Sequence, residues 1–401
     1  MGKQVLILTT VSGFLEKFET GDVRILQRMG YTIHYAANMR EQHYLFREKD
    51  LEEMQIVAHH IDVERSPYMF RENRKAFRQI LEIIDTCDIG VIHCHTPVGG
   101  VLGRMAGRYY KKRDLKVIYT AHGFHFYRGA PLINNTIYYM VEKILARYTD
   151  ILITINEEDY VSARKFRLKP GGRVYKIPGV GLDTQHFQPL SESERKANRK
   201  ELGVQDKFFM VTTGELNENK NQRLILQALQ KMRKDGEDIS HIVYGVCGDG
   251  FFYSRMERWI KEMGLEKQVK LYGYQMDVRN IVGSADCFLF PSKREGLGMA
   301  ALEALSMGVP AVVSDNRGTR EYIHHMDNGY VCSDGKAESF IRGIRYMMSL
   351  DGKKRKRMKR RCRDSVKGFA QDGVLKIMEK IYREMESDEE EDIGPHGGVQ
   401  P

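Results

Sequence analysis

The chain of 401 residues lacks a long apolar run. No segment approaches the roughly 20 consecutive apolar residues that a membrane-spanning helix needs. The first eight residues lead directly into a short apolar strand pattern, without the charged, apolar and small-residue regions of a secretory signal. We therefore expect a cytoplasmic protein.

Motifs that mark common cofactor sites are also missing. The six cysteines form no Cys-x-x-Cys pair, and four of them lie in apolar, strand-like stretches where a thiol is usually a small buried hydrophobic group. A structural zinc site and a disulfide framework are therefore disfavoured. No Gly-x-Gly-x-x-Gly follows a predicted strand and no Walker A loop occurs, which disfavours a nicotinamide enzyme and a P-loop ATPase.

The net charge of +9 is unevenly distributed. Residues 353–363 contain nine Lys or Arg in eleven positions, and residues 384–392 carry seven acids. The ordinary interpretation of such a basic run is a solvated helix face, and the alternative is attraction to anionic lipid headgroups. Nucleic-acid binding is disfavoured, because no aromatic residue interleaves the run and no recognition module surrounds it.

Short apolar runs alternate with helical patterns, which is typical of parallel α/β architecture. A break at 178–183, followed by the polar stretch 191–200, predicts a boundary between two domains. We expect an N-terminal domain over 1–185, a second domain over 186–365, a helix over 366–386 that packs back on the first domain, and a disordered acidic tail over 387–401. The predicted strands are 4–9, 32–36, 55–60, 89–94, 116–121 and 151–155, then 208–212, 241–247, 269–272, 287–290 and 311–314.

The most informative stretch is 291–303, in which two carboxylates are eight positions apart. An apolar strand pattern precedes it, and residues 299–307 lack Gly and Pro, which predicts a helix. Glu295 then lies in a turn and Glu303 about two helical turns on, roughly 9–12 Å away. Either glutamate alone would ordinarily be a solvated residue, but the glycines between them allow a ligand close to the backbone. The amides of Gly296, Leu297 and Gly298 open this helix and form a ready site for a diphosphate.

This stretch resembles the paired-glutamate signature of the retaining glycosyltransferases of family 4. The resemblance implies the GT-B fold, an α/β architecture of two Rossmann-like, doubly wound domains facing each other across a cleft. It also implies that Glu295 binds the sugar end of a nucleotide-sugar and that Glu303 accepts hydrogen bonds from its ribose. The order and spacing of further motifs over positions 5 to 330 extend the resemblance to most of the chain.

The second motif is Ala-His-Gly-Phe-His, at 121–125, which follows a predicted strand. A lone histidine there is more often structural than catalytic, but this sequence is similar to the histidine-glycine motif of the family. The resemblance implies that His122 is the residue closest to the reacting centre. His125 is a weaker candidate that is expected to support the turn, and His95, at the end of another strand, is expected either to line the acceptor side or to hydrogen-bond to residues that do. A metal at the His-x-His of 93–95 is disfavoured, because no nearby Asp or Cys completes a ligand set.

The third motif, 213–221, follows the first strand of the second domain. Lys220 matches the lysine with which the family neutralises the donor diphosphate, but Glu215 stands where the family carries an arginine. We still include Glu215 on the donor side and expect Arg294, Lys293 or Arg317 to compensate. Gly13 stands in place of the usual glycine-rich loop of the first domain.

The resemblance therefore implies a retaining transferase that moves a sugar, most simply from a UDP-sugar, to a hydroxyl of a polyprenyl-diphosphate-linked saccharide in capsule or exopolysaccharide synthesis. No metal or other cofactor is expected. An anionic membrane surface is a further expected partner, because residues 1–185 carry 27 Lys and Arg against 21 Asp and Glu. Two alternatives remain open, a nucleotide-sugar 2-epimerase of the same fold and a non-catalytic scaffold of a polysaccharide assembly complex.

Overall fold

The computed structural model describes residues 3–40, 47–113 and 115–390, with side chains described as far as 386. The chain forms two compact units, and each is described here by itself. Unit 1 comprises the described residues up to Gly181 together with those from Gln371 onward, and unit 2 comprises Leu182–Ala370. No helix in the described ranges is long and apolar enough to cross a bilayer.

Unit 1 is built on a seven-stranded sheet in the order β3-β2-β1-β4-β5-β6-β7, in which every neighbouring pair is parallel. The order reverses between β1 and β4, and this is the point at which doubly wound sheets bind ligands. The strands are β1 (Lys3–Leu8), β2 (Tyr31–Ala37), β3 (Ile56–His60), β4 (Val91–His95), β5 (Lys116–Ala121), β6 (Ile151–Thr154) and β7 (Arg173–Lys176).

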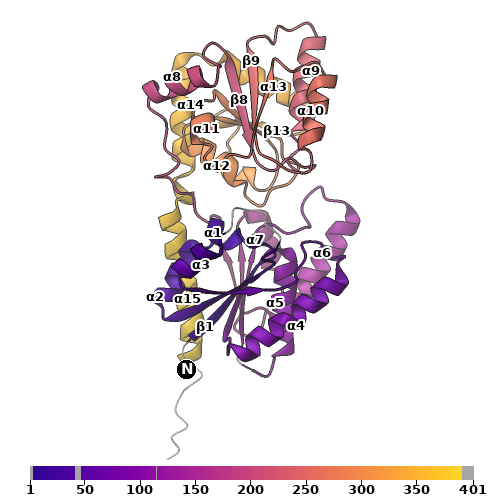
Figure 1. Ribbon diagram of the computed structural model, residues 1–401, viewed down its shortest axis with the longest axis vertical. Helices are drawn as coiled ribbons and strands as arrows, with labels where there is room; N and C mark the ends of the chain where they lie inside the picture. The colour runs from indigo at the N-terminus through magenta and orange to yellow at the C-terminus, as the bar shows by residue number, and fades with distance from the viewer. Residues whose placement is uncertain (1–2, 41–46, 114, 391–401) are drawn as a thin grey trace, which may run out of the picture. The chain divides into compact units, whose positions relative to one another are not determined.

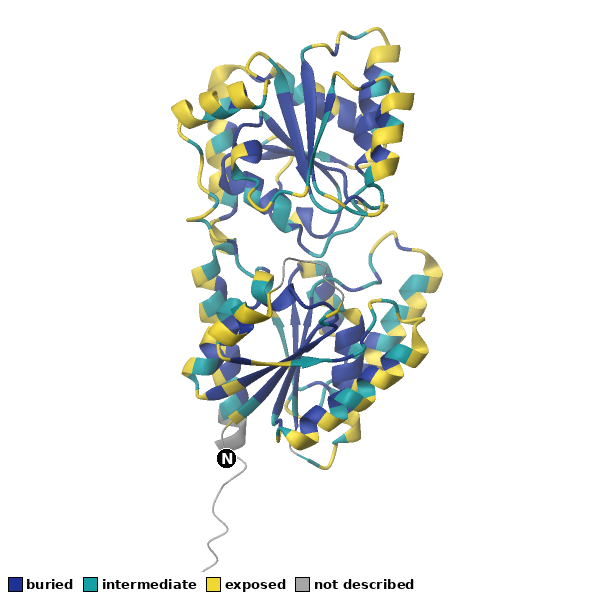
Figure 2. Ribbon diagram, viewed as in Figure 1, coloured by how far each residue is buried: buried dark blue, intermediate teal, exposed yellow. Residues whose placement is uncertain are grey.

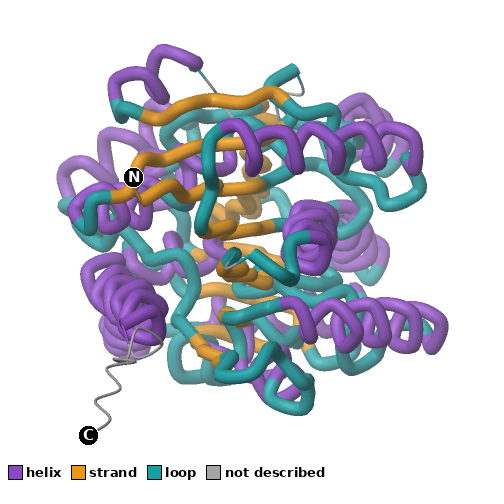
Figure 3. The backbone as a smooth tube through the Cα atoms, turned by 90° about the horizontal axis from the view of Figure 1, so that it is seen from below, coloured by secondary structure: helices purple, strands orange, loops and turns teal. Residues whose placement is uncertain are grey.

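Helices lie on both sides of the strands, as Figure 3 shows. On one side of the sheet of unit 1, α4 packs on α5 and α5 on α6, and on the other side α15 packs against α2 (Figure 1). The helices of unit 1 are α1 (Phe14–Phe18), α2 (Thr20–Arg28), α3 (Glu48–Glu53), α4 (Phe70–Thr86), α5 (Pro97–Tyr109), α6 (Leu132–Leu145), α7 (Glu157–Ala163) and α15 (Gln371–Glu390), with a 3-10 turn over Ala146–Tyr148.

Unit 2 repeats this plan with six parallel strands in the order β10-β9-β8-β11-β12-β13. Its order reverses between β8 and β11. The strands are β8 (Phe208–Thr213), β9 (Ile242–Cys247), β10 (Val269–Gly273), β11 (Cys287–Phe290), β12 (Ala311–Ser314) and β13 (Gly329–Cys332). The helices are α8 (Glu192–Glu201), α9 (Arg223–Lys234), α10 (Tyr253–Glu262), α11 (Arg279–Gly283), α12 (Met299–Ser306), α13 (Ala337–Ser349) and α14 (Gly352–Ser365), with 3-10 turns over Thr319–Glu321 and Lys367–Phe369.

Burial explains why these segments become strands and helices. The central strands of both sheets are covered on both faces, and Figure 2 shows them buried while the outer helix faces are exposed. The strands are therefore almost continuously apolar, as expected for parallel sheets. In α9, by contrast, the buried residues Leu224, Ile225, Ala228, Leu229 and Met232 form one helical stripe.

Several sequence expectations need correction. The edge strands β7 and β13 were not predicted, because each is only four residues long and half-buried. The polar stretch 191–200, for which no helix was predicted and which served only to mark the domain boundary, is mostly the helix α8, which a capping box between Ser191 and Glu194 begins. Arg199 of α8 is buried and bonds to Asp286, so this helix is an integral part of unit 2.

The C-terminal region consists of three helices, α13, α14 and α15. The basic run 353–363 lies within α14, which buries Met358 and Cys362. Two of its arginines form ion pairs within unit 2. Arg355 lies 3.5 Å from Asp286, and Arg361 lies 3.4 Å from Asp327. The last helix, α15, continues to Glu390, four residues beyond the point where we expected the ordered chain to end. Residues 391–401 lie outside the described residues.

Candidate active site

The predicted donor residues of unit 2 lie at the switch point of its sheet. Gly214 and Glu215 follow β8, and Glu295 follows β11, the neighbouring strand at which the order reverses. The two loops are joined by backbone contacts, because Lys293 N donates to Asn219 O at 2.8 Å. Asn219 Nδ2 also donates to Arg294 O at 2.9 Å. The loops after β8 and β11 therefore form one continuous surface.

Lys220 and Glu295 form an ion pair on this surface. Lys220 Nζ lies 2.7 Å from Glu295 Oε1, and the two side chains are 25% and 12% exposed. The ammonium also lies 5.4 Å from the centre of the Phe290 ring. Partial burial strengthens such a pair relative to one on an open surface. The sequence placed these residues 75 positions apart, and the fold brings them into direct contact.

The turn before α12 is held in a shape that only glycine allows. Gly298, the residue before the helix, has φ +92°, and no side chain caps the first amides of α12. Tyr322 OH donates to the carbonyls of Leu297 and Gly298 at 3.0 and 3.1 Å. A Cβ on Gly318 would lie 2.6 Å from Leu297 O, so the loop after β12 packs directly on this turn. Tyr322 and the loop after β12 thus hold this turn in place.

Glu303 lies on α12, half-buried, and Glu215 lies directly after Gly214 with its carbonyl accepting from Gln222 Nε2 at 3.0 Å. The cations that were expected to compensate for the missing arginine have different partners. Lys293 bonds to Glu218 at 3.0 Å. Arg317 is 5% exposed and its Nε donates to Glu295 O at 3.3 Å, so it supports the loop that carries Glu295.

The predicted histidines of unit 1 lie at the other switch point. Gly13 follows β1, His95 ends β4, and His122 follows β5, so all three stand at the carboxyl edge of the sheet. His95 Nδ1 lies 3.1 Å from His122 Nε2, within hydrogen-bonding distance. His125 instead packs its ring 5.1 Å from the ring of Tyr138 on α6.

A buried glutamate that the sequence analysis missed joins these histidines. Glu19 Oε1 lies 3.4 Å from His95 Nδ1 and 4.0 Å from His122 Nε2. Glu19 is only 3% exposed, and burial followed by the charge of Asp22 holds the pKa of its carboxyl well above the usual range. Glu19 is therefore suited to share a proton with the histidines.

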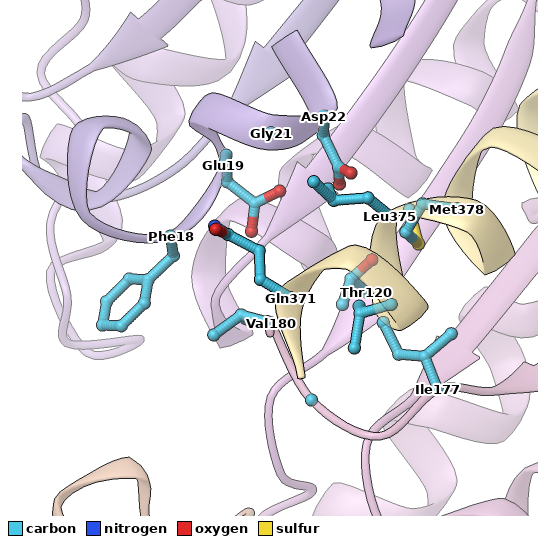
Figure 4. A pocket seen from close by; sticks show the side chains of 12 residues that line it. Phe18, Glu19, Gly21, Asp22, Thr120, Ile177, Val180, Gln371, Leu375 and Met378 are labelled. Atoms are coloured by element: carbon cyan, nitrogen blue, oxygen red, sulfur yellow. The ribbon is translucent and has the colours of Figure 1, made fainter. Parts of the chain in front are cut away.

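The network continues through Asp22 to the C-terminal helix. Asp22 shares hydrogen bonds with Glu19 and with Tyr382 of α15. Tyr382 OH lies 2.9 Å from His93 Nδ1, and His93 Nε2 lies 2.8 Å from Thr120 Oγ1. Figure 4 shows Glu19, Asp22 and Thr120 around a small cavity that Gln371, Leu375 and Met378 of α15 close on another side. Helix α15 is thus part of the wall of the candidate site.

The histidines of this network are neutral at physiological pH. Burial lowers the pKa of His93 to about 3 and that of His122 to about 4. Burial, together with the neighbouring histidines, also lowers the pKa of His95 well below its usual value. A neutral imidazole can both donate and accept, so these rings can orient a hydroxyl group and relay a proton.

Among the residues that the structure describes, two groups of side chains have the spacing of metal ligands. Glu19, His95 and His122 form one, and His34, His59 and Cys87 form the other, with all ligand atoms in each group within 4.8 Å of one another. Metal-bound histidines usually donate their second N–H to an acceptor. His95 Nε2 has no partner among the described residues. For the first group this chemistry fits a hydrogen-bonded network better than a metal site.

The missed residues gave weak signals in the sequence. Glu19 and Asp22 are three positions apart, a spacing that places two side chains on one helix face. Tyr382 occupies a core position in the apolar stripe of α15, where its hydroxyl requires a polar partner. No motif links these residues to the histidines, because the contact depends on how α2 and α15 pack beside β4.

Two family patterns match the chain. The pattern described as "Glycosyl transferase 4-like" matches residues 5–156, and the pattern described as "Glycosyl transferases group 1" matches residues 194–365. The first covers the strands that carry the histidine network. The second covers the loops that carry Lys220, Glu295 and Glu303.

Two individual proteins are similar to this chain over most of its length. EpsD of Bacillus subtilis (strain 168), which is named as a glycosyltransferase, is 38% identical over 345 residues, covering 86% of this chain and 87% of EpsD. An Escherichia coli UDP-Gal:alpha-D-GlcNAc-diphosphoundecaprenol alpha-1,3-galactosyltransferase is 27% identical over 314 residues, covering 77% of this chain and 78% of the enzyme.

Among solved structures, HepE of Anabaena in complex with UDP and glucose superposes with a TM-score of 0.73. It is 18% identical, and the match covers 96% of this chain and 100% of that chain. This likeness supports the fold, which is GT-B with two Rossmann-like domains of parallel strands. With this fold, both family patterns and the similarity to EpsD, the chain belongs to the glycosyltransferases of family 4.

Proposed function

We propose that this glycosyltransferase is a retaining enzyme that transfers a sugar from a UDP-sugar to a hydroxyl of a lipid-linked saccharide, in capsule or exopolysaccharide synthesis. The contact between Lys220 and Glu295 carries the donor part of this proposal. It places a cation and a carboxylate side by side at a switch point, next to the start of α12, where Gly298 has no side chain that could cap the helix. A nucleotide-sugar needs just these two charges, one at its diphosphate and one at its sugar.

In the proposed reaction the acceptor attacks from the face that the nucleotide diphosphate leaves. Lys220 and the amides of Gly296 to Gly298 stabilise the leaving diphosphate, and we propose that no divalent metal is needed. Glu295 stabilises the positive charge that develops on the sugar. Glu303 accepts hydrogen bonds from the ribose.

His122 is proposed to orient the sugar at the reacting centre from unit 1. Its Nε2 lies 3.1 Å from His95 Nδ1, which lies 3.4 Å from Glu19 Oε1, and Asp22 hydrogen-bonds to Glu19. Glu19 is a positioning residue in this scheme, because it acts through the histidines. Replacing Glu19 by Gln is expected to reduce kcat more than to raise KM, since the donor pocket is unchanged.

Similarity to named enzymes supports the choice of donor and acceptor. The Escherichia coli relative is named for a UDP-sugar donor and a diphosphoundecaprenol-linked acceptor, and HepE was crystallised with UDP and glucose. We propose the same classes for this chain, with the enzyme working at the inner face of the cytoplasmic membrane. The particular sugar depends on pocket contacts that similarity at this level leaves open.

The experiment that tests this proposal is calorimetric titration of UDP into the purified protein. The wild type is expected to bind, and Glu303→Ala to bind at least about tenfold more weakly, since it loses the ribose contact. Glu257→Ala on the exposed face of α10 is the matched control and is expected to bind like the wild type. A wild type that does not bind UDP would favour the scaffold alternative.

Incubation with UDP-sugars separates the enzymatic alternatives. A transferase given UDP-GlcNAc without acceptor produces at most slow hydrolysis, whereas a 2-epimerase produces a second sugar nucleotide. Transfer to a polyprenyl-diphosphate saccharide, with the anomeric configuration determined by NMR, tests retention. Activity that is lost in EDTA and restored by a divalent cation would contradict the metal-independent scheme.

A further inference from the structure

The outer face of α6 is apolar where a solvent-facing helix is normally polar. Ile133, Ile137, Met140 and Ile144 are spaced by 4, 3 and 4 residues, and their exposed fractions are 70%, 56%, 45% and 47%. This spacing puts all four on one side of the helix. Glu142 and Leu145 are buried on the other side. Leu132, at the first turn, is 84% exposed and extends the apolar surface.

Further apolar side chains are exposed on the neighbouring helices. Helix α5 packs against α6 and exposes Met105 and Tyr109, and α4, which packs on α5, exposes Phe70. Figure 1 shows α4, α5 and α6 as one layer on the same side of the sheet of unit 1. An exposed apolar stripe such as that of α6 marks a binding site for a partner or a membrane.

The exposed charges of residues 128–147 are all basic, although Glu158 of α7 accepts a hydrogen bond from Arg128 N at 2.7 Å. From 128 to 147 the exposed charged residues are Arg128, Lys143 and Arg147, and the single acid, Glu142, is buried against Arg104 at 2.6 Å. On the helical wheel Lys143 borders the stripe formed by Ile137 and Met140. Two copies of this face would bring like charges together, whereas an anionic surface would attract it.

The helix also begins beside the candidate site. His122 and His125 lie in the loop between β5 and α6, and the ring of His125 contacts Tyr138 of α6. An acceptor that is anchored in lipid must reach this carboxyl edge of the sheet from a membrane surface. The first turns of α6 are thus the part of the patch nearest to the acceptor-side histidines along the chain.

We propose that the exposed face of α6, with Leu132, Ile133, Ile137, Met140 and Ile144, inserts into the headgroup region of an anionic bilayer. This inference rests on the proposed function, because a lipid-linked acceptor brings the enzyme to a bilayer. It assigns membrane binding to an interfacial helix with an apolar face and flanking cations. The basic helix α14 of unit 2 is not the anchor, although it has the denser positive charge.

Vesicle flotation with the full-length protein tests the assignment. The variant Ile133→Gln/Ile137→Gln/Ile144→Gln removes apolar contact from exposed positions, so folding is expected to be unchanged. Its affinity for vesicles of phosphatidylglycerol and phosphatidylcholine is expected to fall at least tenfold. The matched variant Lys353→Gln/Lys356→Gln/Arg357→Gln removes three exposed charges from α14 and is expected to float within about twofold of the wild type.

Three outcomes would overturn the inference: equal flotation of the α6 variant and the wild type, equal binding of the wild type to neutral and anionic vesicles, or an α6 variant that changes only the oligomeric state. UDP titration of the α6 variant keeps this test separate from the proposed function. An α6 variant that binds UDP as tightly as the wild type but no longer floats with vesicles supports the proposed membrane-binding face. If neither the wild type nor the variant binds UDP, the proposed function is wrong, and the flotation result stands by itself.

Discussion

At the scale of single residues, Lys220 and Glu295 hold one another in place before any ligand arrives. The 2.7 Å contact between Nζ and Oε1 fixes two long side chains that would otherwise be free. Fixing them in advance reduces the entropy that substrate binding must overcome. The ion pair is therefore better explained as preparation for a ligand than as a source of stability.

Removing this cation provides the first prediction. Lys220→Gln is expected to lower kcat/KM for the nucleotide-sugar at least about 100-fold, or ~2.7 kcal/mol of transition-state stabilisation, because the departing diphosphate loses its cation. Steady-state kinetics with saturating acceptor measure this. Lys261→Gln, at an exposed position on α10, serves as the control and is expected to stay within about threefold. Equal losses in both variants would contradict a specific role for Lys220.

The buried histidines make stability depend on pH. The folded pKa of His93 is lowered by burial to about 3, from an ordinary value of 6.5. The unfolded chain therefore binds a proton first as the pH falls. The contribution of His93 to stability is complete above pH 6.5 and is lost progressively as the pH drops toward 3.

This gives a second prediction. Between pH 7 and pH 5 the wild type is expected to lose about 2 kcal/mol more unfolding free energy than His93→Gln, which hydrogen-bonds but does not titrate. Urea denaturation at each pH measures the difference. His324→Gln, at an exposed position, is expected to follow the wild type. If the unfolding free energies of the wild type and His93→Gln changed with pH in the same way, the pKa of His93 would not be lowered by burial.

At the scale of elements, the turn before α12 depends on a neighbouring loop. Gly318 has an ordinary backbone angle, φ −71°, so its role is steric. Its Cα lies so close to the turn that an added Cβ would be 2.6 Å from Leu297 O, a backbone atom that cannot move aside alone. The loop after β12 thus holds the amides proposed to bind the diphosphate.

A third prediction follows from this contact. Gly318→Ala is expected to destabilise unit 2 by about 1–3 kcal/mol, because the clash displaces backbone, and to weaken UDP binding. Gly352→Ala, at the first position of α14 with open space around it, is expected to be within 0.5 kcal/mol of the wild type or slightly more stable. Thermal unfolding with and without UDP measures both effects. A Gly318→Ala protein with wild-type stability and affinity would refute the support role.

Helices α5 and α6 are joined by a buried ion pair. Arg104 is fully buried, its Nη1 lies 2.6 Å from Glu142 Oε2, and its guanidinium lies 4.0 Å from the centre of the Tyr119 ring. Burying both charges is costly, so the pair fixes the arrangement of the helices more than it stabilises them. That arrangement determines how α6 presents its outer face.

The fourth prediction separates these two effects. Glu142→Ala is expected to cost about 3–5 kcal/mol, because it leaves a buried arginine without a counter-charge. The double variant Arg104→Met/Glu142→Leu is expected to recover most of that loss, since it buries no charge. Urea denaturation of the two proteins gives the comparison. A double variant as unstable as Glu142→Ala would show that packing, rather than the lone charge, causes the loss.

At the scale of the whole molecule, the sequence predicts the fold well and the site unevenly. Eleven predicted strands match strands of the structure, because apolar runs bounded by turns are typical of parallel sheets. The strands β7 and β13 escape prediction because each combines a length of four residues with partial exposure, which leaves too short an apolar run to recognise. The helix α8 escapes because its charge masks its capping box.

The candidate site likewise contains residues that the sequence predicts and residues that it does not. Lys220, Glu295 and Glu303 follow strands, so their position can be read from local motifs. Glu19 and Tyr382 cannot be found in this way, since they meet the histidines only through the packing of α2 and α15. Contacts between residues 289 positions apart, such as Tyr382 with His93, depend on tertiary structure alone.

A fifth prediction concerns the independence of unit 1. Replacing 182–370 by a short Gly-Ser linker is expected to leave a protein that unfolds cooperatively, because Gly181 and Gln371 are in contact and unit 1 keeps its own core. Circular dichroism on heating measures this. A chain that stops at 181 lacks α15 and is expected to show no cooperative transition, as it loses the buried Val374, Met378 and Ile381. Failure of the linked protein to unfold cooperatively would contradict this independence.

The contact between Gly181 and Gln371, with Leu182 N bonded to Phe369 O at 2.8 Å, means that the chain leaves unit 1 and re-enters it at one point. In genetic terms, the codons for 182–370 form a cassette whose two junctions are adjacent in the folded product. One recombination event spanning that cassette exchanges the entire unit proposed to bind the donor between related genes, while the unit proposed to receive the acceptor is inherited intact. Under the proposed function, such an exchange offers a lineage a route to new sugars on an unchanged acceptor.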